Sequence, residues 1–222
     1  MPPPPPRAAM QGRFCRVEPI EPARHAGDLF AANRLDASGR NWTYLPEESF
    51  GDFAAYRGWL ETIAAADDPL FHAIVAVPDG KAVGVAAFMR IDRKNGVIEV
   101  GNINFSPLLQ KRTAATEAMF LMMRRAFVEL GYRRYEWKCD ALNAASRRAA
   151  LRLGFRYEGL FRQAVVYKGR NRDTAWFSII DGEWPALARA YEAWLAPANF
   201  DAAGRQRADL AAMIAAARGE GR

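Results

Sequence analysis

The chain has 222 residues, 50% of them hydrophobic, and a net charge of +6. This length favours one domain with one sizeable core, and the mild basic excess favours anionic partners. The two cysteines, Cys15 and Cys139, and the two histidines lie far apart in the sequence, which argues against a metal site. No apolar run approaches the roughly 18 residues of a membrane span, and the start MPPPPPRAAM lacks a signal-peptide core, so a soluble, cytoplasmic protein is expected.

Residues 1–12 form a proline-rich stretch that predicts a disordered or polyproline-II tail. A ligand for a proline-binding module is the alternative interpretation. The folded domain is expected over residues 13–196. It opens with a short strand over 13–19 and a helix over 25–35. A loop then carries Trp42, Tyr44 and Leu45, which either fold back onto the core or wall a pocket.

The middle of the chain predicts a helix over residues 50–66, with Phe53, Tyr56, Leu60 and Ile63 three or four residues apart. Three strands follow, over 71–77, 83–91 and 97–105. Turns at 78–80 and 92–96 join them, so they form an antiparallel meander.

The longest helix is predicted over residues 113–130 and ends at Gly131. A strand over 134–139 follows this crossover and should pair in parallel with strand 97–105. A helix over 143–153, strands over 155–167 and 172–180 and a helix over 184–195 complete the domain. Residues 197–222 are expected to be a C-terminal extension with a helix over 201–217. The fold class is therefore α/β (α+β), with a mixed, mostly antiparallel sheet and a ligand crevice at the end of its central strand.

The connection between strand 97–105 and helix 113–130 is the strongest candidate for a binding site. The N-terminus of a helix carries unpaired N–H groups and partial positive charge, and therefore attracts anions. Lys111 and Arg112 add charge there, and the small Ala114 and Ala115 leave room for a phosphate. A solvated basic turn is the alternative on the residues alone.

Three stretches carry a resemblance to a known family: GNINFSPLLQKRTAATEAM, WKCDALNAASRRAALRLGFRYEGLFR and YKGRNRDTAWFSIIDGEW. They resemble, in the same order, the motifs of the GNAT acetyltransferase superfamily. Within it the sequence is most similar to the RimJ/RimL type, which acetylates the N-terminal amine of ribosomal proteins. The resemblance covers roughly residues 13 to 195.

The resemblance implies that acetyl-CoA lies where two parallel strands splay apart, here the strands ending near Phe105 and Cys139. Pantetheine would pair with the backbone of Ile103, Asn104 and Phe105. Thr113 replaces the first glycine of the family's pyrophosphate loop. A threonine fits at this position if its backbone is helical, but a β-branched residue tolerates a left-handed backbone poorly. The phosphate-binding residues implied by the resemblance are Gln110, Lys111, Arg112, Thr113, Ala114 and Ala115.

Asn143 and Ser146 are helix-capping residue types, and capping alone explains them. The resemblance instead implies that Asn143 contacts pantetheine and that Ser146 donates to the leaving thiolate. Arg147 and Arg148 either meet the cofactor's phosphates or are solvated surface charge. Cys139 is expected in the core, because direct transfer needs no cysteine nucleophile.

Glu99 is the candidate general base, because the family often holds a carboxylate on this strand and an amine must lose a proton before it attacks. An ordinary ion pair with an arginine is the alternative. The glutamate that serves as base in the RimL type matches Val165 here. Glu158 and Asp173 are expected to be structural and to pair with arginines such as Arg162 or Arg172.

The sequence therefore predicts an acetyl-CoA-dependent N-acetyltransferase that acts on a primary amine, either a protein N-terminus or a small molecule, by direct attack in a ternary complex. A non-catalytic acetyl-CoA-binding protein is one alternative. A basic nucleic-acid-binding module is another, although the basic residues are scattered and no nucleic-acid motif is visible. The acceptor stays open, as does a homodimer.

Overall fold

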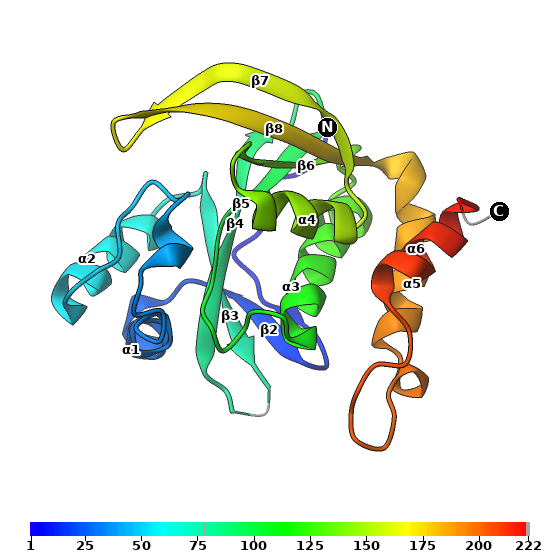
Figure 1. Cartoon of the computed structure of the whole chain (residues 1–222), viewed down its shortest axis with the longest axis horizontal. Coiled ribbons are helices and arrows are strands. Elements are labelled where there is room, and N and C mark those ends of the chain that lie inside the picture. Colours follow the sequence, from blue (N-terminus) through cyan, green and yellow to red (C-terminus); the bar gives the residue numbers. More distant parts are fainter. Residues whose placement is uncertain (78, 221–222) are drawn as a thin grey trace.

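The computed structural model describes residues 1–77 and 79–220. In this part of the chain a mixed sheet forms the centre of the molecule, with the strand order β1-β2-β3-β4-β5-β6-β8-β7 (Figure 1). All neighbours are antiparallel except β5 and β6, so the predicted mixed, mostly antiparallel sheet is confirmed. The strands are β1 Met10–Gln11, β2 Cys15–Pro19, β3 Leu70–Ala76, β4 Ala82–Asp92, β5 Val97–Phe105, β6 Arg134–Asp140, β7 Arg156–Tyr167 and β8 Arg170–Ile180.

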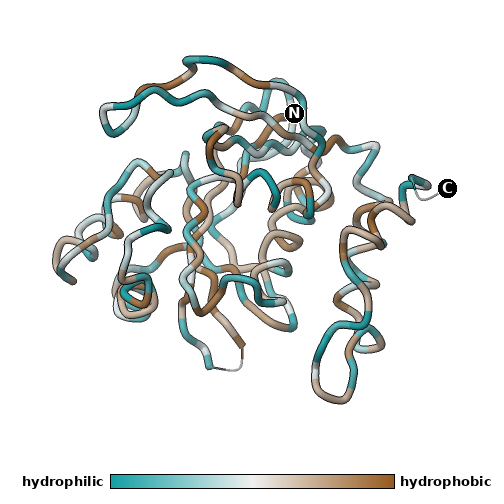
Figure 2. Tube along the Cα trace, viewed as in Figure 1, coloured by the Kyte–Doolittle hydropathy of each residue, from teal (hydrophilic) through white to brown (hydrophobic). Residues whose placement is uncertain are grey.

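Helices cover both faces of the sheet and create two separate cores. The larger core lies on the α3 side and contains Met119, Tyr135 and Phe177. The smaller core lies on the α1 and α2 side and contains Trp42 and Leu60. The hydrophobic stretches are spread along strands and helices, whereas the tip of the β7–β8 hairpin is hydrophilic (Figure 2). The helices are α1 Pro22–Asn33, α2 Phe53–Ala64, α3 Thr113–Arg124, α4 Ala144–Arg152, α5 Trp184–Leu195 and α6 Leu210–Arg218.

The N-terminal segment is ordered against the domain, so the prediction of a disordered tail over residues 1–12 is wrong. Met10 is only 2% exposed and belongs to the larger core, and β1 pairs with β2. Tyr132 donates from its hydroxyl to the Pro3 carbonyl at 3.1 Å, and Arg125 donates to the Ala9 carbonyl at 3.1 Å. Composition missed this because most of the contacts that hold the segment are made by its backbone carbonyls, with Met10 as the one side chain that the larger core includes from it. A polyproline-like chain also has little conformational freedom to lose.

Helix α3 also holds the chain just after that segment. The buried Glu117 carboxylate accepts hydrogen bonds from three consecutive backbone N–H groups, at 2.6 to 2.8 Å; the donors are Arg13, Phe14 and Cys15. Arg125 lies eight residues later, where the helix continues as a π-helical turn over Arg125–Glu129. The two side chains therefore fix residues 8–15 along one side of this helix.

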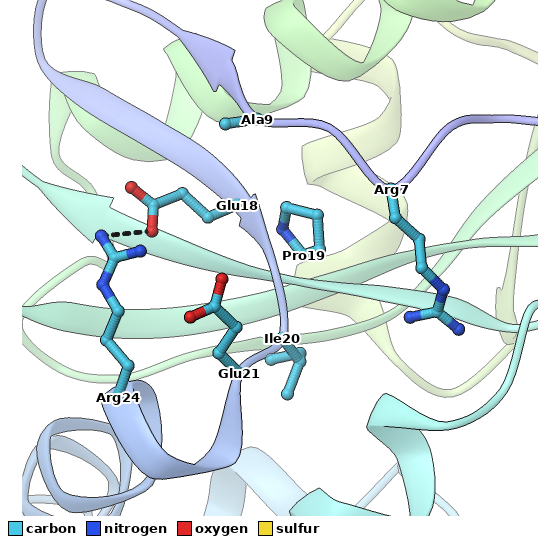
Figure 3. Close-up of a pocket in the computed structure, with 7 residues that line it drawn as sticks. All are labelled: Arg7, Ala9, Glu18, Pro19, Ile20, Glu21 and Arg24. Carbon is cyan, nitrogen blue, oxygen red and sulfur yellow. Dashed lines mark ion pairs between the residues drawn. The ribbon is translucent and has the colours of Figure 1, made fainter.

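A hollow of about 410 Å³ lies between the N-terminal segment and β2 (Figure 3). Its charged lining residues are Arg7, Glu18, Glu21 and Arg24. Arg24 and Arg16 each lie 2.7 Å from the Glu18 carboxylate, and Arg7 donates to the Ala64 and Ala66 carbonyls. The guanidinium groups of Arg16 and Arg24 already neutralise the buried Glu18 carboxylate. We therefore interpret the hollow as a structural gap between two packed segments and not as a binding site.

The C-terminal extension is less helical than its alanine content predicts. Asp201 accepts hydrogen bonds from the backbone N–H groups of Ala203 and Arg205, which forms a turn. Helix α6 begins only at Leu210, after an Asp209 cap, and packs on α5. Within residues 1–77 and 79–220, no helix is long and apolar enough to cross a membrane, and no group of His, Cys, Asp or Glu side chains is arranged to hold a metal ion.

Candidate active site at the divergence of two parallel strands

The parallel strands β5 and β6 pair over only three positions. The register joins Val97 to Arg134, Ile98 to Tyr135 and Glu99 to Glu136. Beyond Glu99 and Glu136, β5 continues to Phe105 and β6 continues to Asp140, but the two strands no longer pair with each other. Backbone groups on the facing edges therefore lack the ladder partners that a buried strand needs. This divergence is the one that the sequence predicts for the centre of the sheet.

A β-bulge on β5 sets which groups face the divergence. Asn102 has φ of 48°, and the register with β4 shifts between Val85 and Ala87. Ser106 donates its N–H to the Val83 carbonyl of β4. Because hydrogen-bonding direction alternates along a strand, the backbone groups of Ile103 and Phe105 point the other way, towards β6. Ile103 thus offers a backbone donor and an acceptor, and Phe105 offers a donor, at the site that the sequence predicts for pantetheine.

The Phe105 carbonyl is already occupied by two side-chain amides. Gln110 donates to it at 2.8 Å and Asn41 donates at 3.2 Å, while Gln110 also donates to the Asn41 side-chain oxygen at 2.8 Å. Gln110 therefore stabilises the end of β5 instead of pointing into the loop. The sequence analysis missed Asn41, because nothing in an isolated loop asparagine indicates a partner 64 residues away.

The loop after β5 leads into the N-terminus of α3, as predicted. The left-handed residue is Lys111, with φ of 60°, while Arg112 is the N-cap and Thr113 is the first helical residue. Thr113 therefore fits without strain. In the described part of the chain, the backbone N–H groups of Lys111, Thr113 and Ala114 have no hydrogen-bond acceptor. These free donors make a cradle for an anion.

Helix α4 brings a serine to the β6 arm of the divergence. Asn143 caps this helix, since its side-chain oxygen accepts a hydrogen bond from the Ser146 N–H at 3.0 Å. The Trp137 indole N–H donates to Ser146 Oγ at 2.9 Å, so the serine hydroxyl proton is directed to another acceptor, and the Cys139 thiol is within its reach. Burial raises the pKa of the Cys139 thiol, although a hydrogen bond from Ser146 opposes that rise. Cys139 is therefore a neutral thiol beside Ser146.

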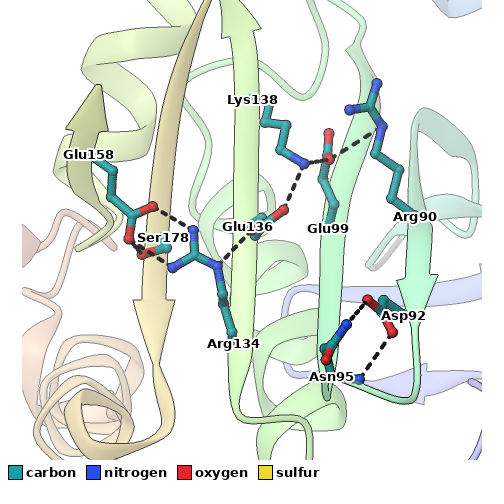
Figure 4. A network of polar contacts seen from close by, with 9 residues as sticks. All are labelled: Arg90, Asp92, Asn95, Glu99, Arg134, Glu136, Lys138, Glu158 and Ser178. Carbon is teal, nitrogen blue, oxygen red and sulfur yellow. Dashed lines mark hydrogen bonds and ion pairs between the residues drawn. The ribbon is translucent and has the colours of Figure 1, made fainter. Parts of the chain in front are cut away.

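Glu99 lies at the last paired position of the divergence, inside a chain of alternating charges (Figure 4). Lys138 Nζ is 2.9 Å from Glu99 and 2.7 Å from Glu136, and Arg90 is 3.6 Å from Glu99. Burial raises the pKa of Glu99, and the charges of Lys138 and Arg90 only partly offset this. The structure is therefore compatible with both interpretations of Glu99, the ion-pair partner and the general base, because it pairs with Lys138 and is also a buried carboxylate whose pKa is raised.

The same chain of charges continues to β7 and corrects one partner assignment. Glu158 pairs with Arg134, with a 2.8 Å hydrogen bond, rather than with Arg162 or Arg172 as predicted (Figure 4). This pair, with a further hydrogen bond from Ser178, lowers the pKa of Glu158. Asp173 accepts from the backbone N–H of Gln163 at 2.7 Å, at a bulge of β7. Both carboxylates thus serve the fold.

The loop before α2 and the tip of the β7–β8 hairpin meet over the open end of the site. Trp42 is buried in the smaller core, whereas Tyr44 reaches the Leu142 carbonyl at 3.1 Å. Lys168 donates to the Trp42 carbonyl at 2.8 Å, and Tyr167 donates to the Asp140 carboxylate at 2.8 Å. Trp42 and Leu45 therefore fold back onto the smaller core, which is one of the two alternatives that the sequence left open, whereas Tyr44 contacts the connection after β6.

Comparison with known proteins gives a consistent result. The family model described as Acetyltransferase (GNAT) domain matches residues 16–156. The crystal structure of a GCN5-related N-acetyltransferase from Brucella melitensis is 51% identical, with a TM-score of 0.94 and 96% of each chain covered. A probable GNAT-family acetyltransferase from Chromobacterium violaceum is 42% identical, with a TM-score of 0.77, over 83% of this chain and 91% of that one. An uncharacterized N-acetyltransferase, YokL, of Bacillus subtilis is 30% identical over 58% of this chain and 71% of its own length.

Proposed function

The chain belongs to the GNAT family of N-acetyltransferases, and we propose that it transfers an acetyl group from acetyl-CoA to a primary amine by direct attack. The observation that carries the proposal is the divergence of β5 and β6 with the N-terminus of α3 beside it. One arm offers unpaired backbone groups, and the helix offers free N–H donors. Together they match an acyl carrier with a peptide-like arm and a pyrophosphate.

The proposed cofactor site follows the loop into α3. The N–H groups of Lys111, Thr113 and Ala114 and the charges of Lys111 and Arg112 would hold the pyrophosphate. The backbone of Ile103 would pair with pantetheine. Among solved structures of the same fold, the microcin C7 self-immunity acetyltransferase MccE was crystallised with acetyl-CoA and AMP. At 20% identity that likeness shows the fold alone, so the cofactor assignment depends on the geometry above.

Ser146 is the proposed hydrogen-bond donor to the leaving group. Bound acetyl-CoA would supply a thioester, from which the thiolate departs when the amine attacks. The Trp137 indole fixes Ser146 Oγ as an acceptor, so the hydroxyl proton is directed elsewhere. A hydrogen bond to developing negative charge is worth roughly 1–3 kcal/mol. Cys139 has no covalent role, because its burial raises the pKa of the thiol and keeps it protonated.

Glu99 is the proposed general base. A carboxylate whose pKa is raised by burial is better matched to accept a proton near neutral pH than an ordinary glutamate. Lys138, at 2.9 Å, would stabilise the ionised form between turnovers. Val165 occupies the β7 position that corresponds to the RimL-type base. Its side chain is 38% exposed and cannot accept a proton because it is aliphatic.

The acceptor is proposed only as a class, a primary amine on a peptide N-terminus or on a small molecule. A putative ribosomal-protein-serine acetyltransferase from Vibrio cholerae shares the fold at 18% identity, which carries no substrate argument. The RimJ/RimL-like assignment therefore depends on the sequence motifs alone, and Val165 departs from that pattern.

The experiment that tests the proposal is a turnover assay of the full chain with acetyl-CoA and a panel of amines. The panel contains N-terminal peptides, polyamines and amino-sugars, and free CoA is measured. Amine-dependent CoA release is expected for at least one class. Binding of acetyl-CoA without release for any amine would instead favour the non-catalytic acetyl-CoA-binding alternative.

A further inference from the structure

Asn104 presents its side chain to the face of the sheet opposite α3. Ile98 and Val100 lie in the larger core, so Glu99 between them faces the other side. The bulge at Asn102 shifts the alternation, and Ile103 and Phe105 then pack against the larger core. Asn104, between those two, therefore returns to the Glu99 face.

The side-chain amide of Asn104 is buried without a hydrogen-bond partner. The residue is only 2% exposed, and neither its Nδ2 nor its Oδ1 finds a partner among the described residues. A buried polar group left unpaired destabilises the folded state, and native structures rarely leave both ends of an amide in that state. The adjacent Ser106 hydroxyl is also buried and unpaired. Two neighbouring buried side chains without hydrogen-bond partners favour a partner from outside the described chain.

The surroundings of Asn104 belong to the amine side of the proposed site. On β6, Trp137 and Cys139 lie in the larger core, so Lys138 and Asp140 face the same side as Asn104 and Glu99. Asn41 donates to the neighbouring Phe105 carbonyl, which places the short helix Arg40–Trp42 beside this end of β5. The cofactor helix α3 lies across the sheet, so the Asn104 side chain points away from the proposed phosphate site.

We propose that the Asn104 amide is a substrate-binding group that holds a peptide-like group next to the attacking amine, with Nδ2 donating to a carbonyl and Oδ1 accepting from an N–H. The inference rests on the proposed function and narrows its acceptor class to amines with an adjacent amide, such as α-amino amides or peptide N-termini. A simple alkylamine offers no carbonyl to Nδ2. The amide chemistry itself, with one donor edge and one acceptor edge, selects this pairing.

The test compares Asn104→Leu with the wild type by calorimetry in the presence of CoA, using alaninamide and isobutylamine as probes. The wild type should bind alaninamide better than isobutylamine. Asn104→Leu should lose roughly 10- to 100-fold in alaninamide affinity, which is the size of one or two lost hydrogen bonds. Its isobutylamine affinity should stay unchanged. The CoA affinity should stay unchanged. Equal affinity of the wild type for both amines, or equal loss for both in the variant, would overturn the inference.

The melting temperature separates a ligand-binding role from a structural one. Replacing an orphaned buried amide by an apolar group of similar size should leave the melting temperature unchanged or raise it. Asn199→Leu is the matched control, because Asn199 is also buried but has partners on both amide atoms, the Trp194 carbonyl at 2.8 Å and the Ala208 N–H at 3.0 Å. Asn199→Leu should therefore melt lower and bind alaninamide normally. If Asn104→Leu lowers the melting temperature as much as Asn199→Leu does, the inference is overturned.

The same measurements separate this inference from the proposed function. Selective alaninamide binding without acetyl transfer to it would refute the transferase proposal and support the role of Asn104. Transfer to isobutylamine and alaninamide with equal kcat/KM would support the transferase proposal and refute the role of Asn104.

Discussion

The indole Nε1–H of Trp137 donates a 2.9 Å hydrogen bond to Ser146 Oγ, which joins β6 to α4 beside the divergence. The tryptophan is 6% exposed and packs on Phe155, so the donor is held rigidly. Since Oγ already accepts this bond, the hydroxyl proton of Ser146 is left to donate. The arrangement orients a weak acid instead of strengthening it.

Ser146→Ala should lower kcat by roughly 10- to 100-fold, which is the cost of one lost hydrogen bond to a leaving group. The factor should not change with pH, because a serine hydroxyl does not titrate in the working range. Acetyl-CoA turnover from pH 6 to 9 measures it. Ser178→Ala is the control, because Ser178 donates to Glu158 on the far strands and should keep full kcat. A loss that varies with pH would contradict the assignment.

Glu99→Gln should lower turnover while acetyl-CoA affinity stays nearly unchanged, because the proposed base does not touch the cofactor. In the wild type, burial raises the pKa of Glu99, so activity should fall as pH drops through that pKa and the base becomes protonated. The deficit of the variant should shrink as pH rises, because more of the substrate amine arrives neutral. Measured pH profiles of kcat/KM test this, and a deficit that grows with pH would exclude Glu99 as the base.

Thr113→Glu should abolish the thermal stabilisation by acetyl-CoA, because it places a negative charge at the first residue of α3. A ligand at about 100 times its Kd adds roughly 2.7 kcal/mol, or roughly 5–10 °C in a chain of this size. Thr62→Glu on α2 is the control, since Thr62 is exposed and lies on another helix. Equal shifts for both variants would rule out this loop as the phosphate site.

Deletion of residues 1–9 should destabilise the protein, because Glu129 is then the one hydrogen-bond partner left for the buried Arg125 guanidinium among residues 10–77 and 79–220. The loss should be about 2–5 kcal/mol, the usual range for breaking a buried charged contact. Urea denaturation measures it. Arg125→Gln in the full chain should reproduce most of the effect. An unchanged unfolding midpoint in both variants would show that the segment contributes nothing to stability.

Elements with strong periodicity could be predicted from the sequence almost to the residue. The strand Val97–Phe105 and the helix Trp184–Leu195 have their predicted bounds. The errors occur where tertiary contacts override composition. The N-terminal segment is fixed by side chains more than a hundred residues away, including Arg125 and Tyr132, and no local pattern reports such partners. Asp201 shortens the last helix through a turn that alanine content hides.

The position of the candidate site in the fold could be predicted from the sequence, but the contacts within it could not. Motif order located the loop at Lys111 to Ala115 and the helix that carries Ser146. The sequence could not show that the left-handed residue is Lys111, because that depends on how the loop enters α3. It also could not show that Lys138 lies between Glu99 and Glu136, since this pairing requires the parallel register of β5 and β6.

The short register between β5 and β6 has a consequence for cooperativity. Three residue pairs join the part of the sheet from β1 to β5 with the part from β6 to β8, whereas β6 and β8 share seven pairs. Amide hydrogens at Ile103 and Phe105 should therefore exchange with solvent faster than those at Ile98, by local opening rather than global unfolding. A bound molecule that pairs with the free edge of β5 would slow this exchange and act thermodynamically as an additional strand.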